Sequence, residues 1–302
     1  MKEWKVKPEG TLSFCWQVKE ASLLSIHLYR SNGSEKHKIV NSKFLFQCIG
    51  MQRLEFSHPI YKISPDPYDP YVGIEIRDSE QRKAYVQSLA CAEDGHFFSQ
   101  NQTPLVEVAW WVNMLGCFHG VILYHSFEEP EVPRPTALHA LDGRTGELLW
   151  TVSNRIWQET LDAIVRVQSG EESYEFLDLR TGQSVPQMPS QSALHEIRLP
   201  VHYPEGNVHL ATLQKLIRYT TENHPIGACD YLELTPLIII SYYFYESEKL
   251  KNNLLVVTNT GQVQFHEPLS LGDAQGHTTF INWRHQLIYI KDQVYLCCYA
   301  VS

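Results

Sequence analysis

The feature that most constrains the fold of this chain is a short pattern that occurs more than once. It is complete in residues 140–150 (ALDGRTGELLW), and part of it recurs 36 residues later in residues 177–183 (LDLRTGQ). A fainter copy, residues 256–263 (VVTNTGQV), follows after 79 residues, about twice the first interval, which indicates a decayed copy in between. In each copy a strand-like run enters a turn closed by Thr-Gly, where glycine accepts the positive φ that a tight reversal needs. In the first two copies Asp142 and Asp178 are expected to shape the turn, because an Asp side chain can bond to the backbone two residues further on. The chain is therefore predicted to be built from repeated hairpins.

Short strand-like runs bounded by turn residues occur along the whole chain and predict an all-β protein. Examples are residues 23–29, 44–49, 72–76, 106–112, 121–125, 164–167, 174–177, 254–258, 263–266, 280–283, 287–290 and 294–299. Passable helical spacing is confined to Leu210, Leu213, Leu216 and Ile217, which is compatible either with a single short helix or with another strand.

The repeat interval of about 36 to 40 residues distinguishes between all-β architectures. Units of roughly 40 to 50 residues, with four strands each, are typical of β-propeller blades. We therefore expect residues 1–302 to form a single β-propeller domain of six or seven four-stranded antiparallel blades. Because an open ring would leave unpaired strand edges, residues 4–6 or 12–18 could pair with the C-terminal run 294–301 to close it.

The repeat also resembles that of the quinoprotein-type (PQQ-like) propellers, whose units carry an Ala-x-Asp-x-x-Thr-Gly-x-x-x-Trp pattern. All five marked positions match in residues 140–150; the second copy keeps Asp178, Thr181 and Gly182, and the third keeps Thr260 and Gly261. The whole chain resembles uncharacterised propeller proteins of Bacteroidota that are grouped as a domain of unknown function. This resemblance implies a propeller and supplies no mechanism. Trp150, a large aromatic residue on a strand, is expected to attach one sheet to the next.

Composition restricts the partners and the compartment. The chain has 25 Lys and Arg against 34 Asp and Glu, a formal net charge of −9, which disfavours nucleic acid as a partner. No apolar run approaches the about 20 residues of a membrane helix, and no apolar segment follows the basic N-terminus. Seven cysteines without regular spacing suit a reducing compartment. We expect a cytoplasmic bacterial protein, monomeric and without a membrane partner.

One candidate binding site lies near the C-terminus. In residues 280–286 (FINWRHQ), strand alternation would place Asn282, Arg284 and Gln286 on one face, with Trp283 and His285 on the other. A polar row of this kind either lines a channel or faces water. We take these three residues as candidate ligand contacts.

A second candidate contains the aromatic pair Trp110-Trp111 with His119. Aromatic surfaces bind sugars and other flat ligands, although packing between sheets is the alternative role. Trp111 and His119 are therefore further candidate ligand contacts. The fourteen histidines form no short metal-ligand pair, and we expect neither a metal nor a cofactor.

Adjacent Cys297 and Cys298 are predicted to be buried and unreactive, because neighbours on a strand point to opposite faces. No catalytic residue can be assigned, since the chain has neither a nucleophile elbow nor a phosphate-binding glycine loop. The function predicted is a binding or protein-interaction propeller that holds a protein or small-molecule ligand. The alternative is a hydrolase or lyase acting on a carbohydrate or small metabolite, because sites in propellers collect polar groups from many blades.

Overall fold

The computed structural model describes residues 13–19, 23–29, 51–91, 105–128, 134–186, 196–271 and 279–301. The chain divides into two units, Met1–Gly50 and Met51–Ser302. In the first unit, β1 (Ser13–Lys19) and β2 (Leu23–Tyr29) form a two-stranded antiparallel sheet. Most of the run 12–18 thus belongs to β1, whose partner is β2, and residues 4–6 lie outside the described residues.

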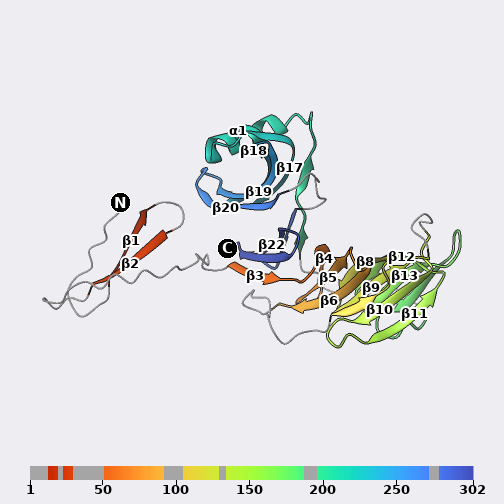
Figure 1. Ribbon diagram of the computed structural model, residues 1–302. Helices are drawn as coiled ribbons and strands as arrows, with labels where there is room; N and C mark the ends of the chain where they lie inside the picture. Colours follow the sequence, from red (N-terminus) through yellow and green to blue (C-terminus); the bar gives the residue numbers. More distant parts are fainter. Residues whose placement is uncertain are drawn as a thin grey trace. The chain divides into compact units, whose positions relative to one another are not determined.

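Five antiparallel sheets and the helix α1 (Leu210–Thr221) make up the described part of the second unit (Figure 1). Sheet I contains β4 (Ile60–Pro65), β5 (Tyr71–Asp78), β6 (Lys83–Ala90) and β7 (Val106–Val108). Sheet II contains β8 (Val112–Phe118), β9 (Val121–Ser126), β10 (Ala137–Asp142) and β11 (Leu148–Ser153). Sheet III contains β12 (Ile156–Leu161), β13 (Ile164–Gln168) and β14 (Tyr174–Asp178).

The two remaining sheets have five strands each. Sheet IV contains β16 (Val201–Tyr203), β17 (Pro225–Leu234), β18 (Leu237–Glu246), β19 (Lys249–Thr258) and β20 (Val263–Leu271). Sheet V contains, in spatial order, β15 (Ile197–Arg198), β21 (Phe280–Trp283), β22 (Gln286–Lys291), β23 (Tyr295–Ala300) and β3 (Met51–Glu55). The prediction of an all-β protein is confirmed, with one helix.

Apolar faces join the five sheets in one series. Separate buried clusters lie between sheets III and II, II and I, I and V, and V and IV. Burial of these faces is the main stabilising contribution to such a stack. Among the described residues no cluster joins sheet III to sheet IV, so the sheets are not closed into a ring, and neither a propeller nor a blade number of six or seven is established.

Helix α1 covers the face of sheet IV that is not packed on sheet V. Leu210, Leu213 and Ile217 are buried against β17, β18 and β19, and their spacing places them on one side of a helix. The helical interpretation of this segment is therefore the right one. The helix ends at Thr221; the C-cap residue Glu222 has a left-handed backbone, and its N–H donates to the carbonyl of Arg218.

Sheet V is extended beyond its C-terminal strand β23 by a strand from the start of the second unit. β3 pairs antiparallel with β23, as Figure 1 shows where the orange strand runs beside the blue ones. A charged cluster supports this pairing: the Arg53 guanidinium on β3 lies 2.7 Å from the buried carboxylate of Glu267, which also accepts hydrogen bonds from Tyr289 and Lys291. A single domain over residues 1–302 stays a prediction.

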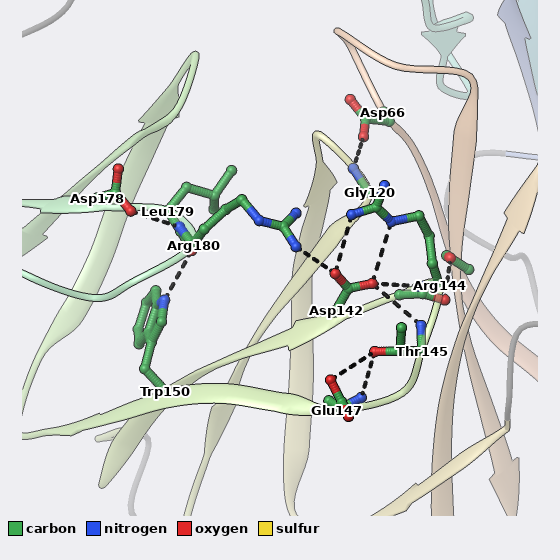
Figure 2. A network of polar contacts seen from close by, with 12 residues as sticks. Asp66, Gly120, Asp142, Arg144, Thr145, Glu147, Trp150, Asp178, Leu179 and Arg180 are labelled. Atoms are coloured by element: carbon green, nitrogen blue, oxygen red, sulfur yellow. Dashed lines mark hydrogen bonds and ion pairs between the residues drawn. The ribbon is translucent and has the colours of Figure 1, made fainter.

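The repeated turns are held by side-chain caps. The Asp142 carboxylate accepts hydrogen bonds from the backbone N–H groups two and three residues further on, at 2.9 and 3.3 Å (Figure 2). Asp178 does the same in the second copy, at 3.1 and 2.8 Å. In the third copy the hydroxyl of Thr258 accepts from Gln262 N–H at 3.1 Å. The role predicted for these aspartates is confirmed.

Residues of the first copy of the repeat also form hydrogen bonds with the second copy. The indole N–H of Trp150 donates to the carbonyl of Leu179 at 2.9 Å, and Arg180 lies 2.5 Å from the Asp142 carboxylate (Figure 2). Burial acts to raise the pKa of Asp142, but hydrogen bonds from Arg144 and Arg180 outweigh it and lower that pKa to about 2. Trp150 thus attaches sheet II to the turn after sheet III, as the sequence predicted.

Replacement of Gly182 by alanine should destabilise the protein by about 3 kcal/mol. A Cβ there would meet the Trp150 ring at 2.6 Å, and the φ of +66° is strained for any residue with a Cβ. Gly206→Ala is the matched control, because its φ is +86° and nothing lies within 4 Å of its Cβ position, so only about 1 kcal/mol should be lost. Urea unfolding measures both; equal losses would contradict the proposed Trp150 contact.

His125 contributes a link between sheets II and III that depends on pH. Its buried Nε2 accepts a hydrogen bond from the backbone N–H of Trp157 at 3.1 Å, which requires the neutral ring. Burial, with a smaller contribution from His139, lowers the pKa of His125 to about 4. Since the unfolded value is about 6.5, the unfolded chain takes up the proton first as the pH falls.

The stabilisation from neutral His125 should therefore be complete above about pH 6.5 and lost as the pH falls towards 4. The slope from this group is at most about 1.4 kcal/mol per pH unit. In His125→Gln an amide oxygen can still accept the Trp157 N–H but does not titrate, so the decline in unfolding free energy between pH 7 and pH 4 should be shallower. Parallel pH profiles of the two proteins would refute this assignment.

Candidate functional site

The β21–β22 hairpin positions the first group of candidate residues. Its two-residue turn is Arg284-His285, with φ values of +50° and +59°. Trp283 pairs with Gln286 and Asn282 with Leu287, so Asn282 and Gln286 lie on opposite faces of sheet V. The prediction that Asn282, Arg284 and Gln286 share one face is wrong, because the alternation of a strand stops at the turn.

A cavity of about 740 Å³ lies beside this turn and brings Asn282 and Arg284 together with residues of β15 and the β17–β18 turn. Its charged and titratable lining residues are Glu196, Arg198, Glu233, Arg284 and His285, its neutral polar ones Thr235 and Asn282, and its apolar ones Leu234, Pro236, Leu237 and Val301. Gln286 does not line it; the Gln286 amide oxygen accepts a hydrogen bond from the Cys298 thiol on the other face. The cavity is within the range of about 300 to 1,000 Å³ typical of small-ligand sites.

Arg284 is the group in this cavity with unused donor capacity. Its guanidinium lies 5.3 Å from the centre of the Trp283 ring, and its Nε is buried without a hydrogen-bond partner among the described residues. Trp283 is itself fixed, since its indole N–H donates to the carbonyl of Asp66 at 3.0 Å. The other arginine, Arg198, is paired with Glu196 at 2.7 Å. A buried donor without a partner favours an acceptor supplied by a ligand.

His119 lies in a second polar cluster, where turns of three sheets meet. It begins the β8–β9 turn, with φ +49°, and its ring stacks on that of Tyr68 in the β4–β5 turn, with the ring centres 4.5 Å apart. The His119 Nε2 is 2.8 Å from a carboxylate oxygen of Asp162, in the β12–β13 turn, and its Nδ1 is 3.4 Å from Asp69. The Asp162 N–H donates to the Tyr68 hydroxyl at 2.6 Å. An imidazole between two carboxylates can carry a proton between them and a substrate.

Asp66 holds this cluster in place. Its carboxylate accepts hydrogen bonds from Tyr68 N–H and Asp69 N–H at 2.9 and 3.1 Å, which fixes the β4–β5 turn. It also accepts from Gly120 N–H at 2.8 Å, which links that turn to sheet II (Figure 2). Burial raises the pKa of Asp66. The side chain is a positioning group, because its two carboxylate oxygens accept from these three N–H groups and from the Cys117 thiol.

Trp111 lies far from His119. The expected strand 106–112 is interrupted, because β7 ends at Val108 and β8 begins at Val112, so the two tryptophans occupy a break between strands. Trp111 is 41% exposed, and its ring meets the Trp110 ring edge-on at 6.2 Å. Trp111 and His119 flank opposite ends of the seven-residue β8, which is about 24 Å long, so they cannot share a small ligand.

Neither a metal centre nor a reactive thiol is evident in the described ranges. No group of three or more His, Cys, Asp or Glu there could hold a metal ion. Cys297 and Cys298 are buried in different clusters, on opposite faces of β23 as predicted, and burial raises the pKa of both thiols. No helix within the described part of the chain has the length and apolarity needed to cross a bilayer.

Comparison with known proteins adds a family of undefined function. A family described as "Domain of unknown function (DUF4905)" matches residues 66–150, less than a third of the chain. This segment contains Asp66, Trp111 and His119 but not Arg284. No curated protein matches the chain, so no named relative indicates a specific function.

Two solved structures are weakly similar to the chain. The computationally designed protein Ika8 is 13% identical, with 95% of this chain and 82% of that chain covered and a TM-score of 0.21. The endo-arabinase from Bacteroides thetaiotaomicron is 10% identical, with 82% of this chain and 98% of that chain covered and a TM-score of 0.23.

Sequence reasoning found one member of each polar group and missed its neighbours. Asp69 and Asp162 join His119, and Glu196 and Arg198 line the cavity with Arg284, from turns and strand ends that are distant in the sequence. The sequence signal that could have identified these residues was their position in predicted turns, because turn residues lie beyond the ends of the sheets. Spacing along the chain could not show which turns meet.

Proposed function

We propose that this protein is a binding module that holds a small anionic ligand in the cavity beside the β21–β22 turn. The observation that carries the proposal is Arg284, a cation whose buried Nε has no hydrogen-bond partner among the described residues. A carboxylate is the matching group, since a guanidinium offers paired N–H donors to its two oxygens. The ring of Trp283 holds the guanidinium in place before the ligand arrives, which reduces the entropy lost on binding.

Replacement of Arg284 by glutamine should weaken carboxylate binding at least tenfold. The test is a thermal-shift screen of small carboxylates, including aliphatic acids, hydroxy acids, uronic acids and amino acids, followed by calorimetric titration of those that stabilise the protein. Arg82→Gln is the matched control, because Arg82 is an exposed arginine with φ +52° in the β5–β6 turn and does not line the cavity. Equal affinities in the two variants, or no carboxylate bound by the wild-type chain, would overturn the proposal.

A second candidate function, that of a hydrolase or lyase for a carbohydrate or small metabolite, is supported by the cluster around His119. Two carboxylates there meet one imidazole, the combination that proton transfer to and from a substrate requires. The His119 side chain is 29% exposed, and that of Asp69 44%, so a substrate can reach both.

If this chain is such an enzyme, His119→Gln should reduce kcat at least 100-fold. Assays would use chromogenic glycosides and unsaturated or hydroxylated acids as substrates, with Asp69→Asn as a second variant and thermal unfolding as the check that both fold. Turnover that survives both substitutions would exclude this cluster as the catalytic site.

We further propose that the five sheets belong to a propeller that includes the whole chain, with quinoprotein-type repeats, and that the protein is a monomeric bacterial protein of the cytoplasm without a nucleic-acid or membrane partner. Antiparallel sheets of three to five strands, stacked in series, and the pairing of β3 with the C-terminal β23 support the propeller. A crystal structure in which sheets III and IV are linked through further blades is the expected result. An open stack in the crystal would contradict it.

A further inference from the structure

The geometry points to an enzymatic activity at a site outside the Arg284 cavity: hydrolysis of small neutral carboxylic esters, with Ser126 as the nucleophile and His139 as its general base. Both residues belong to sheet II, and neither lines that cavity. The inference is therefore independent of the proposed binding function.

Ser126 and His139 face the same side of sheet II from neighbouring strands. Ser126 is the last residue of β9 and pairs with Ala137 of β10, and His139, two residues further along β10, pairs with Tyr124. Directly paired residues of antiparallel strands lie on the same face, and so do residues two apart along one strand. The two side chains therefore meet diagonally, and the Ser126 Oγ lies 2.9 Å from the His139 Nε2.

Thr151 of β11 orients the imidazole through its other nitrogen. It pairs with His139 across the strands, and its hydroxyl oxygen lies 2.9 Å from the His139 Nδ1. The buried ring of Tyr124 stacks on the imidazole, with the ring centres 4.7 Å apart and an angle of 15° between the planes. A nucleophile bonded to a base, with the base oriented by a third group, is the arrangement that activates serine hydroxyls in hydrolases.

The hydrogen bonds around Ser126 decide which ring nitrogen accepts. The Thr136 hydroxyl donates to the Ser126 carbonyl at 3.0 Å, and its oxygen lies 3.3 Å from the Ser126 Oγ. The His139 Nε2, at 2.9 Å, is therefore the closer acceptor for the Ser126 proton, which leaves Nδ1–H to donate to Thr151. Burial lowers the pKa of His139, so the ring is neutral at pH 7 and can take up a proton.

The environment of this group favours a small uncharged substrate. Ser126 and His139 are each half-buried and Thr151 is exposed, so a small molecule can reach them. In the part of the chain that the structure describes, no charged side chain forms a hydrogen bond or ion pair with these three residues. A charged substrate would therefore lose hydration here without gaining a partner, whereas a neutral ester would not.

The reaction that this geometry supports has two steps. The Ser126 Oγ attacks the ester carbonyl carbon as its proton passes to His139 Nε2, and His139 returns that proton to the alcohol oxygen as its bond to the carbonyl carbon breaks. Water then attacks the acyl-serine and gives a proton to His139, which passes it to the Ser126 Oγ as the carboxylic acid leaves. Thr151 lacks the negative charge with which a carboxylate stabilises the imidazolium, so turnover should be slow and easiest to detect with activated esters.

The test is reaction of the full chain with a fluorescent fluorophosphonate, which phosphonylates activated serine residues with loss of fluoride. We expect labelling at Ser126, located by mass spectrometry of peptides, and its loss in Ser126→Ala. His139→Gln should label at least 100-fold more slowly, because glutamine can bond to the serine but cannot accept its proton. Failure to label Ser126, or equal rates in His139→Gln and the wild-type chain, would overturn the inference.

Ser169→Ala is the matched control for loss of a serine hydroxyl. Ser169 lies in the β13–β14 turn, where its hydroxyl bonds to Ser173 and, within the described ranges, to no imidazole. This variant should label at the wild-type rate, and labelling that falls as far as in Ser126→Ala would contradict the assignment. Thermal unfolding checks that each variant is folded.

Thr151 is a positioning residue, and two substitutions there separate its hydroxyl from its bulk. Thr151→Val should slow labelling about tenfold, and Thr151→Ser should recover most of the rate, because only serine can accept the Nδ1 proton of His139 in a hydrogen bond. Equal rates in these two variants would contradict that role. Hydrolysis of p-nitrophenyl acetate or butyrate by the wild-type chain, and its loss in Ser126→Ala, completes the test; labelling of Ser126 without ester turnover would overturn the activity.

Discussion

The contact between Trp150 and the turn that contains Gly182 shows what the arrangement of the sheets depends on. A large apolar ring of one sheet lies against the backbone of the next turn, and it can do so because glycine leaves room where a Cβ would lie 2.6 Å from the ring. The same principle, burial of one sheet's face against its neighbour, joins all five sheets of the second unit. Because both faces of the inner sheets are used in this way, side chains free to meet a ligand are left mainly in turns and at strand ends.

This division explains which parts of the structure could be predicted from the sequence. The strands, and the capping of the repeated turns by Asp142 and Asp178, depend on local chemistry: alternation or burial of apolar residues, and an acceptor placed two residues before a free N–H. Trp150 was predictable for the same reason, since an aromatic residue at a fixed distance from a turn has a fixed place in a repeat. The helix at Leu210 was only one of two readings, because four apolar residues are too few to separate a helix from a strand.

The candidate sites were harder to predict, because they depend on where turns fall and which turns meet. Asn282, Arg284 and Gln286 alternate in the sequence, but Arg284 and His285 form a two-residue reversal, after which the next strand returns with its pairing set by hydrogen bonds to β21. One misplaced turn was enough to assign Gln286 to the wrong face. Similarly, Trp110 and Trp111 lie in a break between strands, and nothing in the hydrophobic pattern marks that break.

The His119 cluster and the Arg284 cavity differ in whether their polar groups already have partners in the protein, and this difference ranks the two functional candidates. Around His119 the charges and donors are matched within the protein: the imidazole has two carboxylates within 3.4 Å and lies on an aromatic ring, so the group is complete without a ligand and also links three sheets. In the cavity beside β21, Arg284 has a buried donor that finds no partner among the described residues. A polar group left unsatisfied in a folded protein costs free energy, which binding of a complementary ligand recovers. The cavity is therefore the better candidate for ligand binding. The His119 cluster is accounted for by a structural role, which is to hold the turns together.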